Sequence, residues 1–219
     1  MSSLIVRTSK ISKNFGYFSA LRDISINIEA GEAVAVLGPN GSGKSTLIKI
    51  IATHMRPSSG RIEVFGLSSV KKAKEVKRRI GYVAHGSFLY DELTVEENLR
   101  FYQSMFSAVP KTKEVNLDGL LGLVRLKKWT KTPVGNLSHG LRKRADIARA
   151  MVHEPKLLLL DEPFSGLDET SRNVLRDYLL HQHGEVTLML TSHDAALARQ
   201  VCRRSILLEK GTVVRDTEF

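Results

Sequence analysis

The chain has 219 residues, enough for one large domain with a substantial core. Its 33 Lys and Arg against 23 Asp and Glu give a formal net charge of +10, typical either of a protein that works against nucleic acid or anionic lipid, or of one with a solvated basic face. No apolar run reaches the roughly 18 residues that cross a bilayer, residues 1–10 lack the apolar stretch of a signal peptide, and the lone Cys202 excludes an internal disulfide. We therefore expect a soluble, unexported chain.

Short apolar runs alternate with helical patterns along the chain, which is typical of an α/β fold with a mostly parallel sheet. We predict strands over residues 24–28, 32–37, 61–66, 156–161, 186–192 and 204–215, the last a hairpin that turns at Lys210 and Gly211. The pattern becomes helical at Leu93, where Thr94 and Glu97 form a predicted capping box. We expect one domain over residues 1–219, with a helical subdomain inserted at about residues 93–150.

The stretch GPNGSGKST, residues 38–46, follows a predicted strand and precedes a helical pattern. Its spacing fits G-x-x-x-x-G-K-[ST], in which backbone N–H groups and a helix N-terminus face the β-phosphate of a nucleotide. Lys44 would reach the β- and γ-phosphate oxygens, and the Ser45 hydroxyl would ligate Mg²⁺. We predict an ATP site made by Gly38, Pro39, Asn40, Gly41, Ser42, Gly43, Lys44, Ser45 and Thr46.

Two acids end an apolar strand in the stretch LLLLDEP, residues 157–163. Asp161 is placed to hold Mg²⁺ through water, and Glu162 to polarise the attacking water as a general base, although the pair could instead cap a helix. His193 follows the next predicted strand, where an imidazole could donate a hydrogen bond to the γ-phosphate. We predict catalytic roles for Lys44, Glu162 and His193, with Ser45 and Asp161 as metal ligands.

Five motifs in order resemble the ATP-binding subunits of ABC transporters, over about residues 4–215. Besides the Walker A loop, the Walker B strand with Glu162, and the switch His193, they include a signature at 137–141 and a D-loop at 165–168. The resemblance implies a P-loop ATPase fold, in which an antiparallel β part and an inserted helical subdomain accompany the mostly parallel sheet. It also implies that Phe15 stacks on adenine.

In the family that the chain resembles, two such domains pair head to tail, so the signature of one closes on the ATP of the other. Ser138 would open a helix whose N-terminus points at that γ-phosphate. The resemblance thus implies ATP and Mg²⁺ as cofactors, a second ATP-binding subunit as a homodimer partner, and an integral membrane permease. It implies a peripheral place on the cytoplasmic side of the cell membrane, and no nucleic acid partner is expected. The residues that it assigns to the second subunit's site are Leu137, Ser138, His139 and Gly140, with Asp168 in the D-loop.

The chain departs from the family pattern at three positions. His139 replaces a glycine of the signature, Leu141 replaces its glutamine, and His85 stands where the Q-loop glutamine is expected. His139 either crowds the phosphate or adds a hydrogen-bond donor. The metal contact at His85 is left open.

The stretch at residues 85–102 resembles the ATP-binding subunits of haem exporters in cytochrome c maturation, and similar stretches occur in other small export-type ATPases. We expect ATP-driven export, with haem as one candidate cargo. A soluble ABC ATPase, for example of iron–sulfur assembly, is an alternative that suits the basic charge. A nucleotide-binding regulatory subunit with weak hydrolysis is another, favoured by the three departures.

Three large apolar side chains follow the Q-loop position. Phe88, Leu89 and Tyr90 stand beside Gly86 in a stretch without helical or strand pattern. We predict that they dock on a short cytoplasmic helix of the membrane partner, the alternative being that they pack under the helices of the subdomain.

Overall fold

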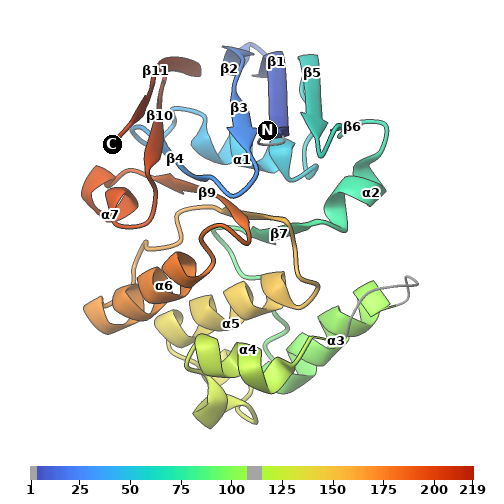
Figure 1. Cartoon of the computed structure of the whole chain (residues 1–219), viewed down its shortest axis with the longest axis vertical. Helices are drawn as coiled ribbons and strands as arrows, with labels where there is room; N and C mark the ends of the chain where they lie inside the picture. The colour runs from blue at the N-terminus through green and yellow to red at the C-terminus, as the bar shows by residue number, and fades with distance from the viewer. Residues whose placement is uncertain (1–3, 108–114) are drawn as a thin grey trace.

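The computed structural model describes residues 4–107 and 115–219, and in this part of the chain two sheets and a layer of helices are stacked (Figure 1). The central sheet has six strands, and its neighbours from β10 to β7 run parallel, whereas β11 closes it as an antiparallel hairpin partner. Its order is β11 (Thr212–Glu218), β10 (Arg204–Glu209), β4 (Ala33–Leu37), β9 (Thr187–Ser192), β8 (Leu157–Leu160) and β7 (Ile80–Val83).

An antiparallel sheet lies on one face of this central sheet, at the top of Figure 1. The helix α1 (Lys44–Ile51) shares one apolar core with both sheets. The order of the antiparallel sheet is β2 (Phe18–Ile24), β1 (Leu4–Phe15), β5 (Ser59–Val64) and β6 (Leu67–Ser68), with β3 (Asn27–Glu29) paired to β1.

Helices cover the other face of the central sheet (Figure 1). They are α3 (Val95–Ser107), α4 (Leu117–Leu123), α5 (His139–Met151) and α6 (Glu169–His181), with short 3₁₀ turns at Lys127–Trp129 and Val134–Asn136. Of two further helices, α2 (Ala73–Lys77) contacts the edge strand β7, and α7 (Ala195–Arg199) contacts the inner strands β9 and β4. Among the described residues, no helix combines the length and the apolar character needed to cross a bilayer.

The strands β4, β9, β8 and β7 of the central sheet are buried on both faces, and their side chains alternate between two cores. In β8, Leu157 and Leu159 pack with α1 and the antiparallel sheet, whereas Leu158 and Leu160 pack with the helices. Because successive residues of a strand point to opposite faces, an uninterrupted apolar run is what such a strand needs. The run of four leucines therefore fixes β8 at the centre of the molecule.

The predicted α/β fold, with a mostly parallel sheet, an antiparallel β part and inserted helices, is confirmed. The capping box is also confirmed, since Glu97 Oε2 accepts from Thr94 N at 2.8 Å and Glu97 N donates to Thr94 Oγ1 at 3.2 Å. Cys202 is buried, and burial raises the pKa of its thiol to about 12, as expected for a small core residue.

One strand prediction was wrong, and several strands were not predicted. The single strand predicted over 24–28 is divided, since β2 ends at Ile24 and β3 begins at Asn27, after a left-handed residue at Asp23 (φ 50°). The strands β1, β6 and β7, and residues 18–23 of β2, were not predicted. In β1 the polar residues outnumber the apolar ones because most of its side chains point away from the core, and β7 is only four residues long.

The contact between β7 and α5 generates a stability prediction. A Cβ at Gly81 would lie 2.5 Å from the Ala150 carbonyl oxygen and 2.9 Å from Leu158 Cδ1, so Gly81→Ala must push α5 away from the sheet. We expect a loss of about 1–3 kcal/mol in the free energy of unfolding, measured by urea denaturation. Gly86→Ala is the matched control because nothing lies within 4 Å of its added Cβ. Equal stability of the two variants would contradict the packing described.

Candidate functional site

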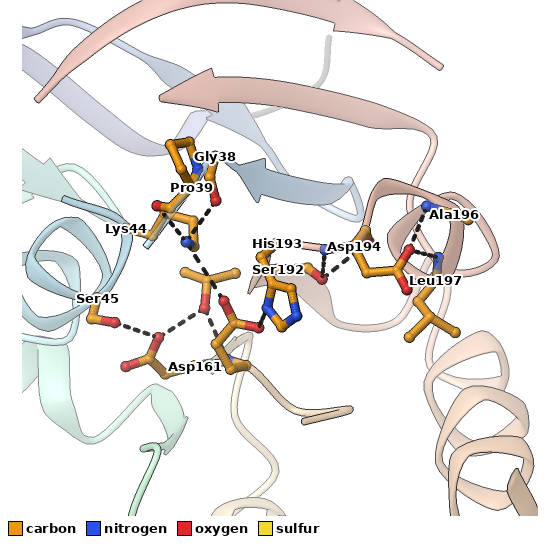
Figure 2. Close-up of polar contacts among 12 residues, drawn as sticks. Gly38, Pro39, Lys44, Ser45, Asp161, Ser192, His193, Asp194, Ala196 and Leu197 are labelled. Atoms are coloured by element: carbon orange, nitrogen blue, oxygen red, sulfur yellow. Dashed lines mark hydrogen bonds and ion pairs between the residues drawn. The ribbon is translucent and has the colours of Figure 1, made fainter. Parts of the chain in front are cut away.

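The loop at residues 38–46 joins β4 to α1 and folds around the side chain of Lys44. Gly43 caps α1 with φ 106°, and a Cβ there would lie 2.6 Å from the Ala20 carbonyl oxygen, so only glycine fits. Lys44 is 5% exposed, and its Nζ donates to the carbonyls of Gly38 at 2.8 Å and Pro39 at 3.1 Å (Figure 2). The loop thus holds one ammonium group beside the N-terminus of α1, an arrangement that favours a bound anion.

Asp161 joins the loop to the end of the central sheet. Its carboxylate is 1% exposed, and Oδ1 accepts from Ser45 Oγ at 2.9 Å and from Thr191 Oγ1 at 2.7 Å. In Figure 2 the side chains of Ser45 and Asp161 point toward one another. Hydroxyl and carboxylate oxygens are the ligands that Mg²⁺ prefers, so this pair fits a magnesium site, either directly or through water.

Glu162 follows directly and lies between two cationic or protonatable groups. Its Oε1 is 3.6 Å from Lys44 Nζ, and its Oε2 is 3.1 Å from His193 Nδ1. The backbone of Glu162 has φ 48°, an uncommon conformation for a residue with a side chain, and its N–H donates to Thr191 Oγ1 at 2.8 Å. Such backbone strain often occurs at functional sites, and here it turns the carboxylate toward the loop.

A cavity of about 420 Å³ opens over these groups. It is lined by Phe15, Asn40, Gly41, Gly43, Lys44, Ser45, Thr46, His85, Glu162 and His193 from the sequence prediction, and also by Phe18, Ala20 and Ser165. The apolar end is formed by Phe15 and Phe18, which are exposed and are paired residues of β1 and β2. The cavity thus has a cationic end and an aromatic end, which suits a nucleotide.

The predicted signature residues lie elsewhere. Residues 137–140 do not line the cavity among the residues that the structure describes. Ser138 caps α5 by accepting from Leu141 N at 3.4 Å, and both Ser138 and His139 are exposed. The chain therefore brings together the loop, the acids and His193, but not the signature.

The start of α5 instead packs on the D-loop and the start of α6. His139 Nε2 lies 3.3 Å from the Ser165 carbonyl oxygen, and a Cβ at Gly140 would lie 2.1 Å from Ser171 Oγ. Asp168 caps α6 by accepting from Ser171 N at 2.7 Å, and this backbone hydrogen bond is the main reason why the pKa of Asp168 is lowered. The signature and the D-loop thus form one packed surface unit.

Three residues of the site, Thr191, Phe18 and Ala20, were missed by the sequence analysis, whereas Ser165 belongs to the predicted D-loop. Thr191 binds both Asp161 and the Glu162 backbone, and Phe18 and Ala20 line the cavity. Thr191 could have been found, because it stands two residues before His193, near the end of the strand predicted there. Nothing in the local sequence singles out Phe18, since its place depends on the pairing of β1 with β2.

Comparison with known proteins identifies the family of the chain. A protein-family model described as "ABC transporter" matches residues 21–165. The ABC transporter ATP-binding protein NatA of Bacillus subtilis is 36% identical over 197 residues, covering 89% of this chain and 80% of that protein. A probable sulfate/thiosulfate import ATP-binding protein CysA of Chlorella vulgaris is 39% identical over 217 residues, covering 98% and 90%. The Nod factor export ATP-binding protein I of Rhizobium johnstonii is 35% identical, covering 99% and 70%.

Solved structures give the same result. An ATP-binding subunit of an ABC transporter has a TM-score of 0.88 at 29% identity, covering 98% of this chain and 90% of that one. A dimeric ATP-binding cassette in a post-hydrolysis state, bound to ADP and Pi, has a TM-score of 0.87 at 26% identity, covering 98% of each chain.

Fold and site together define a P-loop ATPase. The chain belongs to the ABC transporter family. It is an ATP-binding subunit of an import or export system, and the reaction that it catalyses is ATP hydrolysis.

The contact of His139 with the D-loop generates a prediction about local stability. His139→Gly removes the ring that lies over the Ser165 carbonyl, so amides of residues 165–168 should exchange with deuterium faster, by about two- to tenfold for one lost hydrogen bond. Hydrogen exchange read by mass spectrometry measures this. His139→Gln keeps a side-chain donor and should retain most of the protection. An unchanged exchange rate in His139→Gly would mean that the ring contact does not hold the D-loop.

Proposed function

We propose that the cavity binds Mg·ATP, with the phosphates on the loop at residues 38–46 and the adenine against Phe15. The observation that carries the proposal is the continuous set of contacts from Lys44 through Glu162 to His193 at one end of the cavity. Ser45 and Asp161 would hold Mg²⁺, which neutralises charge on the β- and γ-phosphates when it is bound. Stacking on an aromatic ring recognises the face of a base, which suits the apolar end.

The general base that we propose is Glu162. Lys44 and His193 flank the two carboxylate oxygens of Glu162, so the carboxylate is fixed beside the place where the γ-phosphate would lie. His193 is exposed toward the cavity and would donate a hydrogen bond to the γ-phosphate or hold the attacking water. His85 also lines the cavity, in the Q-loop position, and there we propose a contact with water rather than with the metal.

A second subunit would complete the site. We propose a head-to-tail homodimer in which Leu137, Ser138, His139 and Gly140 of one subunit close on the ATP of the other. Two observations support this arrangement. Ser138 and His139 at the N-terminus of α5 are exposed, and they do not line the cavity of their own subunit. In addition, one similar structure is a dimeric cassette bound to ADP and Pi. Asp168 would lie beside that interface, because it belongs to the same packed unit as the signature.

The partner that we propose is an integral membrane permease, which would place this subunit peripherally on the cytoplasmic side of the cell membrane. One similar structure is described as part of the transporter complex cbiONQ, and this supports such an assembly.

For the domain organisation we propose one ABC ATPase domain over residues 1–219, with the helical subdomain at about 93–150.

An aromatic surface, made by Phe88, Tyr90, Phe101, Tyr102 and Met105, is the proposed docking place for a cytoplasmic helix of the permease. Phe88 is 40% and Tyr90 47% exposed, whereas Leu89 is only 7% exposed and packs with the helices. Of the two alternatives for residues 88–90, docking thus suits Phe88 and Tyr90, and packing suits Leu89. The exposed rings contact one another, with 5.3 Å between the centroids of Tyr90 and Phe101.

Export is the direction that we propose, and haem remains one candidate cargo. A relative named for Nod factor export supports export, although relatives of similar identity are named for sulfate/thiosulfate import. The candidacy of haem rests on the resemblance of residues 85–102 alone. Because a permease carries the cargo, identifying this partner would decide the question.

The proposed base is tested by Glu162→Gln. The variant keeps the size of the side chain but cannot accept a proton, so ATP turnover should fall by about 10²- to 10⁴-fold while ATP binding persists. Phosphate release and equilibrium dialysis with labelled ATP measure the two quantities. Lys44→Ala is the contrasting variant, since it should lose binding as well. Undiminished ATP turnover in Glu162→Gln would show that another residue is the general base, and His193 would be tested next.

The proposed docking place is tested by crosslinking. A cysteine at Tyr90, in a Cys202→Ser background, should crosslink to the candidate permease in membranes, because Tyr90 lies on the aromatic surface. A cysteine at Arg215, on β11 at the other end of the central sheet, is the control and should crosslink poorly. If only the cysteine at residue 215 crosslinks, or if the permease does not change the rate of ATP turnover, a soluble role is favoured instead.

A further inference from the structure

A strongly basic surface surrounds the short helix α2. We define it as Lys71, Lys74, Lys77 and Arg78, whose side chains are all exposed. Val76 is buried and anchors the helix, so the charged side chains are held on its outer side. The neighbouring cations differ, since Lys72 pairs with Glu75 at 2.8 Å and Arg79 lies over the Phe65 ring. Among the described residues, the four members of the basic surface have no carboxylate within ion-pair distance.

This basic surface adjoins the aromatic surface. The helix α2 packs on β7, and the ring of Tyr82 in that strand lies 6.0 Å from Phe88. His54 bridges the two surfaces, because its ring lies 6.1 Å from Phe88, while burial and then the charge of Lys77 lower its pKa. In Figure 1, α2 and α3 are on the same side of the molecule, opposite the hairpin of β10 and β11.

The combination of unpaired cations and adjacent exposed aromatics has a specific physical consequence. Four cations within residues 71–78 produce a positive field that persists over about 8 Å at physiological ionic strength. If a permease occupies the aromatic surface, as proposed above, the basic surface is held close to the membrane from which that permease emerges. The cytoplasmic leaflet that carries acidic lipids has a negative surface potential, which is complementary in charge.

We propose that the basic surface on α2 binds the headgroups of anionic lipids directly. This inference rests on the proposed function, since docking on a permease brings α2 to the membrane. Each Lys or Arg near an anionic surface strengthens partitioning by about fivefold, so the four together contribute on the order of several hundredfold. The lipid contact would therefore retain and orient the subunit beside the permease between catalytic cycles.

The test uses the purified full chain and vesicles of phosphatidylcholine, with or without phosphatidylglycerol, in a sedimentation assay. We expect binding only when phosphatidylglycerol is present, and its loss when salt is raised from about 0.1 M to about 1 M, which shortens the screening length from about 10 Å to about 3 Å. The quadruple variant Lys71→Gln, Lys74→Gln, Lys77→Gln and Arg78→Gln should bind at least a hundredfold more weakly.

A matched variant removes the same charge from other exposed elements. It carries Lys128→Gln, Arg199→Gln, Arg203→Gln and Arg215→Gln, and it should bind vesicles within a few-fold of the unmodified chain because these residues lie away from α2. Equal losses in the two variants would overturn the proposal in favour of net charge alone. Equal binding to vesicles without phosphatidylglycerol, or unchanged binding of the α2 variant, would also overturn it.

Two further measurements distinguish lipid binding from nucleic-acid binding and from a defect in ATP turnover. The first measures binding of a short duplex DNA. If the chain binds this DNA more tightly than the vesicles, and the α2 variant loses the DNA binding, the lipid assignment is overturned in favour of nucleic acid. ATP turnover is measured in both variants and should match the unmodified chain, because none of the changed residues lines the nucleotide cavity. Failure of the proposed function would be seen as absent turnover in the unmodified chain, whereas failure of the lipid proposal would be seen in the vesicle assay alone.

Discussion

The carboxylate of Asp161 is the group on which the geometry of the site depends. It is almost completely buried, and a buried carboxylate is stable only if hydrogen-bond donors surround it. Ser45 from α1 and Thr191 from β9 supply those donors, so three elements that are far apart in the sequence are fixed at one point. The same Thr191 hydroxyl accepts from the Glu162 backbone, which holds that residue in its left-handed conformation. The orientation of the proposed base toward Lys44 and His193 therefore follows from how one buried acid is satisfied.

The helix α5 connects this nucleotide face with the aromatic surface. Its first turn carries Ser138 and His139 and packs on the D-loop, whereas Arg149, three turns later, lies 5.2 Å from the Phe88 ring and 5.3 Å from the Tyr102 ring. The guanidinium also donates to Asp146 and to the Tyr82 carbonyl, so it is held on several sides. One continuous helix thus contacts the aromatic surface near its C-terminal end and carries the proposed signature at its N-terminal end.

The departures from the family pattern have a structural explanation in one case. A glycine at residue 139 would leave the Ser165 carbonyl without the partner that the imidazole provides. The chain thus replaces backbone freedom in the signature with a contact to its own D-loop, whereas Gly140, where Ser171 leaves no room for a side chain, is retained. The sequence alone did not decide whether His139 crowds the phosphate or donates a hydrogen bond to it. The structure adds the contact of His139 with the Ser165 carbonyl.

The sequence by itself determined the class of fold, and it was enough to single out the loop at residues 38–46 with Asp161, Glu162 and His193, because these depend on local patterns: an apolar strand, a glycine-rich turn, and acids at a strand end. It also determined the capping box at Thr94 and Glu97, which is complete within four residues. Only the tertiary structure decided the roles of Thr191 and Phe18, the burial of Leu89 beside exposed Phe88, and the strands β1 and β7. Each of these depends on which distant segment lies alongside, and the local pattern of side chains does not record that. A short strand or a single ring has the same sequence whether it meets a neighbour or water, and it is the neighbour that fixes its place.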